Sequence, residues 1–179
     1  MSKTIVESGM TFGPFPDDEC FELEKSGIYR RIQSGVMMAE FALLRHSRGA
    51  DRPPAVWLVE AKSSSPQPET QPNFEQFIDE IRQKLINALH LVLAATLHRH
   101  PEAAGDLPAG FAALTLREDF KLVLVIKGHP QAWLEPLQNA MRQAFKSLIK
   151  TMGLTPMSII VMNDAIAHDY GLTGVAPLM

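Results

Sequence analysis

Residues 73–100 carry the longest amphipathic pattern in the chain, and this pattern limits the folds that the chain can adopt. Large apolar residues recur there at helical spacing and mark one continuous stripe: Phe74, Phe77, Ile78, Ile81, Leu85, Leu89, Val92 and Leu93. We expect Asn73 to cap this helix, with Gln76 at its third position, and Pro101 to end the pattern. A helix with such a stripe must pack against another apolar layer.

Apolar runs on both sides of this helix predict the sheet that would form that layer. Residues 36–44 and 56–62 are apolar on both faces, so we expect them to be central strands of an antiparallel hairpin with a long polar loop. Further strands are expected at 20–24, 111–116, 120–126 and 157–162, and a second helix at 133–152. This order predicts an α/β fold: one three-layer domain over residues 1–179, with a central mixed β-sheet flanked by helices.

Composition indicates the cellular compartment of the protein more than its function. The chain has 179 residues, 46% of them hydrophobic, which suffices for a core in one domain. The net charge of -3 argues against a broadly basic nucleic-acid coat but permits a local basic groove. The single cysteine, Cys20, cannot form an internal disulfide, and neither a signal peptide nor a membrane span is visible. We expect a soluble, cytoplasmic protein without membrane association.

Charged residues interrupt two of the expected strands. Side chains alternate across a strand, so Glu60 and Lys62 should share one face where residues 56–62 leave the sheet. Glu40 lies inside an otherwise apolar run, where an unpaired carboxylate would cost several kcal/mol or stay protonated. If the hairpin brings Glu40 beside Glu60, a divalent cation such as Mg²⁺ or Mn²⁺ would hold both carboxylates ionised.

Two carboxylates that hold such a cation next to a lysine form a known apparatus for phosphodiester hydrolysis. The arrangement of Glu40, Glu60 and Lys62 resembles that of the PD-(D/E)xK nuclease superfamily, over roughly residues 21–126. The resemblance implies a restriction-endonuclease-like core, metal ligation by Glu40 and Glu60 and a catalytic role for Lys62. It also implies a further acidic metal ligand upstream, for which Glu24 or Glu22 is the nearest candidate. The implied partner is nucleic acid, with DNA favoured.

Other interpretations of these residues stay open. A second acidic-x-lysine triplet, formed by Asp119 and Lys121, stands where a turn enters a strand and is better explained by solvated charges. The charges at Glu40, Glu60 and Lys62 can equally form a structural ion-pair cluster in a catalytically inactive α/β interaction protein. A small-molecule-binding protein has no phosphate-loop glycine motif in its favour. A homo-oligomer or a protein partner is possible for both the nuclease and the interaction protein. Gln83 and Lys84 are plausible neighbours of the site.

Overall fold

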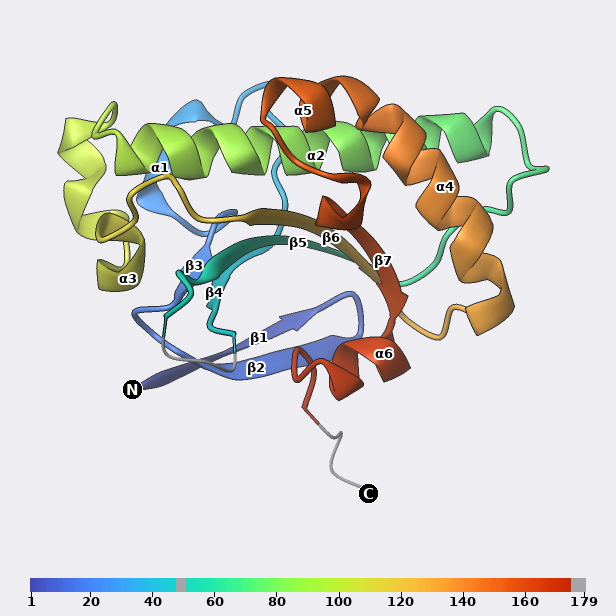
Figure 1. Cartoon of the computed structure of the whole chain (residues 1–179), viewed down its shortest axis with the longest axis horizontal. Coiled ribbons are helices and arrows are strands. Elements are labelled where there is room, and N and C mark those ends of the chain that lie inside the picture. Colours follow the sequence, from blue (N-terminus) through green and yellow to red (C-terminus); the bar gives the residue numbers. More distant parts are fainter. Residues whose placement is uncertain (48–50, 175–179) are drawn as a thin grey trace.

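The computed structural model describes residues 1–47 and 51–174 and is built on a five-stranded mixed sheet (Figure 1). Its strands, in spatial order, are β3 (Cys20–Glu22), β4 (Phe41–Arg45), β5 (Ala55–Lys62), β6 (Phe120–Ile126) and β7 (Ile159–Asn163). β3, β4 and β5 pair antiparallel, whereas β5, β6 and β7 pair parallel. The expected antiparallel hairpin of central strands is therefore confirmed, and its long loop includes residues 48–50, which lie outside the described residues.

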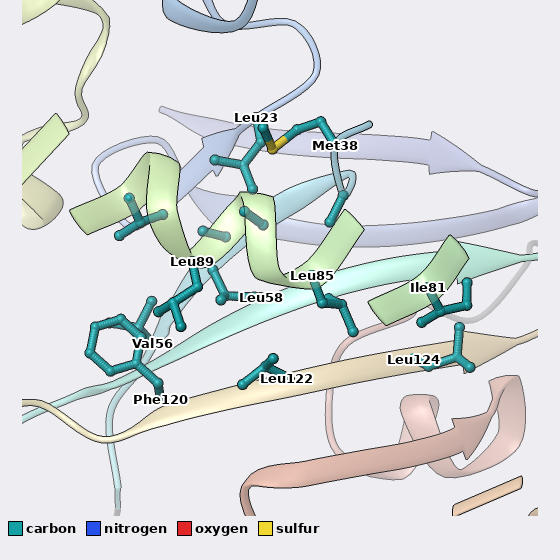
Figure 2. Close-up of a cluster of buried hydrophobic side chains, with 14 of the residues drawn as sticks. Leu23, Met38, Val56, Leu58, Ile81, Leu85, Leu89, Phe120, Leu122 and Leu124 are labelled. Atoms are coloured by element: carbon teal, nitrogen blue, oxygen red, sulfur yellow. The ribbon is translucent and has the colours of Figure 1, made fainter. Parts of the chain in front are cut away.

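One face of the sheet is covered by helices (Figure 1). The long helix α2 (Asn73–Thr96) packs on β4 and β5, and α4 (Leu134–Ala144) packs on β7 and on α2. Figure 2 shows Ile81, Leu85 and Leu89 of α2 directed at the apolar side chains of β5 and β6. These α2 residues are fully buried, as the period of the apolar stripe predicts.

The other face of the sheet is covered by a second hairpin and a short helix, which the sequence analysis did not predict. β1 (Ser2–Glu7) and β2 (Met10–Pro16) form a separate two-stranded antiparallel sheet, and α6 (Asp164–Asp169) lies beside it (Figure 1). Phe12 and Phe41 pack edge to face across this interface with ring centroids 5.3 Å apart. The predicted mixed sheet flanked by helices is thus confirmed, but the layer on the face opposite α2 and α4 is mainly a β-hairpin.

Short helices complete the connections between these elements. They are α1 (Gly27–Ile32), η1 (Pro101–Asp106), α3 (Ala109–Ala112), η2 (Gln131–Trp133), α5 (Lys146–Thr151) and η3 (Pro156–Ser158). Within the described ranges, none of the helices is both long and apolar enough to cross a bilayer.

Several expected boundaries were wrong. Residues 111–116 are not a strand, because Phe111 is the fully buried anchor of α3 and packs on Phe21. The expected helix at 133–152 is divided at Phe145 into α4 and α5. Asn73 does not cap α2; Pro72 occupies that position, without a capping side chain. The strands expected at 20–24 and 36–44 shorten to β3 and β4, so Glu24 and Glu40 flank strands instead of lying in them.

Candidate functional site

Glu60 occupies the centre of the site, in β5 and below α2. It lies on the same face of β5 as Val56 and Leu58, whose side chains belong to the apolar core under α2, and it is 0% exposed. The Nζ atom of Lys62 lies 3.5 Å from Glu60 Oε1, which confirms that these two side chains share a face. β5 therefore carries a fully buried carboxylate into an apolar layer and ends, two residues later, on a partly exposed lysine.

α2 brings two further charged side chains to the same place. Lys84 Nζ donates to Glu60 Oε1 at 2.9 Å, and Lys62 Nζ donates to Glu80 Oε1 at 2.6 Å. Residues four apart in a helix are separated by about 6 Å along its axis, and residues two apart in a strand by about 6.6 Å. Because these spacings nearly match, Glu80 lies against Lys62 and Lys84 lies against Glu60. We call these four alternating charges the charge ladder.

Glu40 directly precedes β4, close to Glu60. The antiparallel register ends at the pair Phe41–Val59, and Glu60 follows Val59 in β5. The Glu40 amide donates to Val59 O at 3.1 Å, and the Glu40 carbonyl accepts from Leu23 N at 3.0 Å, which holds this backbone on both sides. The Glu40 side chain is half-buried, and it lies close enough to Glu60 for the charge of Glu60 to raise the pKa of Glu40.

Burial makes both carboxyls weak acids. Burial, together with the negative charges of Glu60 and Glu24, raises the pKa of Glu40 to about 8. Burial also raises the pKa of Glu60 to about 7, although the neighbouring ammonium groups of Lys84 and Lys62 oppose that change. Two half-neutral carboxyls at physiological pH form a site that gains most from an added positive charge.

One oxygen of Glu60 has no partner. Lys84 and Lys62 both approach Oε1, whereas Oε2 is buried and accepts no hydrogen bond from the residues that the structure describes. Glu118 Oε2 is likewise buried without a partner, but that carboxylate closes a local turn by accepting from the Thr115 amide and hydroxyl through Oε1. At Glu60 a bound cation would satisfy Oε2 and would also offset the repulsion between Glu60 and Glu40.

The donor set fits a hard divalent cation held by two carboxylates. Mg²⁺ is commonly bound through one or two carboxylates, with substrate phosphates and water completing its coordination. Glu40 and Glu60 can supply those two carboxylates. Over residues 1–47 and 51–174, no group of three or more His, Cys, Asp or Glu side chains is gathered closely enough to hold a metal ion. Glu24, the expected third ligand, lies exposed in the turn after β3.

Sequence reasoning identified part of this site and missed the contribution of α2. Lys84 was expected near the site without a role, and Glu80 was not identified. Their signal in the sequence is an acidic and a basic residue four apart on a helix, a pattern that normally indicates a solvated helix surface. Only the packing of α2 on β5 makes Lys84 the nearest cation to Glu60.

The competing candidates lie apart from the charge ladder. Asp119 and Lys121 pair at 2.8 Å at the start of β6, and Asp119 is largely solvated, as expected for the second triplet. Cys20 is buried, and burial raises the pKa of its thiol to about 12, which makes it unreactive.

Comparison of this chain with protein-family models, with curated proteins and with solved structures finds no match. The site is therefore interpreted from its own geometry.

The raised pKa values of Glu40 and Glu60 predict how stability depends on pH. A carboxyl whose pKa is higher in the folded than in the unfolded protein binds more protons in the folded state, so stability falls as pH rises through that range. With pKa values of about 8 and about 7 against 4.5 for the ordinary carboxyl, we expect the free energy of unfolding to decrease by several kcal/mol between pH 5 and pH 8.

Urea unfolding at pH 5, 6.5 and 8 measures this change. Glu40→Gln should flatten the pH profile, because it removes one of the two groups and the repulsion it exerts on Glu60. A Glu40→Gln profile as steep as that of the unchanged protein would show that groups other than Glu40 cause the dependence.

Proposed function

We propose that this protein is a Mg²⁺- or Mn²⁺-dependent nuclease with a restriction-endonuclease-like core, which hydrolyses phosphodiester bonds of nucleic acid, with DNA as the favoured substrate. One observation carries the proposal: Glu60 is fully buried, Lys84 and Lys62 lie against its Oε1, and its Oε2 has no partner among the described residues. Glu40 lies close enough for the charge of Glu60 to raise its pKa, so a bound cation would satisfy that oxygen and offset the repulsion between the two carboxylates.

Each charged residue of the site has its own role in the proposed reaction. Glu60 and Glu40 would hold the cation, which when bound supplies charge stabilisation at the phosphate and lowers the pKa of water. Lys62 is partly exposed at the end of β5 and presents its ammonium group where a phosphate can approach. Glu80 orients that ammonium group at 2.6 Å, and Lys84 donates to Glu60 at 2.9 Å and favours its ionised form.

A second candidate function is supported by the charge ladder itself. Its charges compensate one another along β5 and α2, which a stable ion-pair network does without any ligand. In that case the protein is a catalytically inactive α/β interaction protein of the same fold. The two candidates differ in whether Glu60 Oε2 and Glu40 take up a cation.

Calorimetric titration with Mn²⁺ at neutral pH separates them without knowledge of the substrate. We expect saturable binding by the unchanged protein and at least a tenfold loss of affinity in Glu60→Gln, since a ligand oxygen is replaced by an amide nitrogen or left uncharged. Asp119→Asn is the matched control, because it changes the other acidic-x-lysine triplet and should bind Mn²⁺ as the unchanged protein does.

Circular dichroism establishes that each variant is folded before the titration. Absence of Mn²⁺ binding, both alone and with a short uncleavable phosphorothioate oligonucleotide present, would contradict the nuclease proposal and favour the interaction protein. Equal binding by the unchanged protein and Glu60→Gln would place any metal elsewhere.

A further inference from the structure

A pocket lies at the same end of the sheet as Lys62. β5 and β6 run parallel, so the connections that follow them leave the sheet together (Figure 1). The Lys127 amide donates to the Lys62 carbonyl at 2.9 Å and ties these two connections to each other. In open α/β sheets, ligands bind preferentially outside the carboxyl ends of the strands. The pocket is thus placed where a substrate that reaches Lys62 would extend.

The lining of the pocket suits a flat ring with polar edges. Its apolar surface comes from side chains of both connections and of the helices that they enter: Pro66, Pro68, Phe74, Trp133, Pro136 and Leu137. Ser65, Gln67, Glu69 and His129 add hydrogen-bonding groups. Phe74 and Leu137 are buried and form the base, whereas Trp133 is 47% exposed and stays accessible.

Trp133 is held in position before any ligand arrives. Its backbone amide donates to Pro130 O at 2.9 Å, and its ring meets the His129 ring edge to face with centroids 5.9 Å apart. His129 is fixed in turn, because Asn163 Nδ2 donates to its carbonyl at 3.0 Å. An accessible indole that is already ordered offers a stacking surface at low entropic cost.

We propose that this pocket binds an unpaired nucleobase of the strand whose phosphate contacts Lys62. Bases of every kind stack on aromatic side chains, and Lys62 at the same end of the sheet suits a flanking phosphate. A base inside a duplex is not accessible to such a pocket, so the substrate is single-stranded or carries an extruded base. The inference rests on the proposed nuclease function for the phosphate, but base binding is measurable without cleavage.

Tryptophan fluorescence tests the pocket directly. The chain has two tryptophans, and Trp57 is buried in the opposite core layer, so Trp57→Phe leaves Trp133 as the only indole emitter. With EDTA present, a short oligothymidylate should quench this emission saturably. An oligonucleotide of the same length made of abasic sites, and a blunt duplex, should not. By anisotropy of a labelled oligothymidylate, Trp133→Ala should bind about tenfold more weakly.

Leu97→Ala is the control, since Leu97 is also a large exposed apolar residue but follows the far end of α2. Equal binding of the thymidylate and abasic strands, equal affinity of Trp133→Ala, or no binding at all would overturn the pocket inference. Cleavage in Mn²⁺ is measured separately. Cleavage without base-dependent quenching would refute the pocket alone, and base-dependent quenching without cleavage of any nucleic acid would refute the nuclease proposal alone.

Discussion

Glu60→Gln should reduce Mn²⁺-dependent cleavage of single-stranded DNA by about a thousandfold or more. Glutamine has the shape of glutamate, and its carbonyl can still accept from Lys84 and Lys62, so the charge ladder keeps its geometry. The substitution removes the negative charge and the free oxygen that would hold the cation. Loss of one group that stabilises developing charge in a water-excluded site typically costs a hundredfold to a thousandfold, and loss of the ion itself costs more.

Lys62→Met and Asp119→Asn are the comparison variants for this prediction. Lys62→Met keeps the carboxylates and should lower the rate about a hundredfold while Mn²⁺ still binds, because only the ammonium group at the phosphate is lost. Asp119→Asn should cleave normally. A folded Glu60→Gln protein that cleaves at the unchanged rate would contradict the assigned site. A contaminating nuclease would be recognised by rates that no substitution alters.

Lys84→Met should lower the free energy of unfolding by about 3 kcal/mol at pH 8. Lys84 is the closest cation to the fully buried Glu60, at 2.9 Å, and Lys62 lies farther away and is shared with Glu80. Removing one partner of a buried ion pair leaves an uncompensated charge, which costs about 3–5 kcal/mol. Glu60 can avoid part of that cost by taking up a proton, so its pKa should rise further and the loss should be smaller at pH 5.

Urea unfolding at the two pH values measures this effect, and two variants control it. Arg82→Met breaks the Asp79–Arg82 pair on the same helix, which is largely solvated, and should cost less than 1 kcal/mol. Lys84→Met combined with Glu60→Gln should recover most of the lost stability, because the buried charge is then absent. If the double variant is no more stable than Lys84→Met, the loss arises from packing of the lysine stem instead of from the charge.

The predicted elements succeeded where one pattern repeated over many residues. The stripe from Phe74 to Leu93 requires a helix, because several turns agree on one face. The run 56–62 favours a central strand because it is short and apolar on both faces. Prediction failed at 111–116, where a short apolar run fits either element and the choice was made by Phe111, which fills a space beside Phe21. The β1–β2 hairpin was missed because Gly13 and Pro14, which interrupt β2, are residues that normally indicate a turn.

The candidate site, like the fold, was predicted from the sequence only in part. Alternation along β5 was enough to place Glu60 and Lys62 on one face, and an acidic residue in an apolar run was enough to mark Glu40 as needing a partner. The sequence could not determine that Glu60 has two cationic neighbours, because Lys84 is 24 residues away and reaches it only through the packing of α2 on β5.

What the sequence by itself determined is therefore local: the period of each element, the face that each charge occupies and the chemistry that those charges permit. What only the tertiary structure decided is which charges meet. The spacing of Glu80 and Lys84 on α2 matches that of Glu60 and Lys62 on β5, and the pairing of β4 with β5 brings Glu40 within range of the Glu60 charge. Those contacts depend on how a helix and two strands are docked, and docking is fixed by the whole apolar core instead of by any single segment.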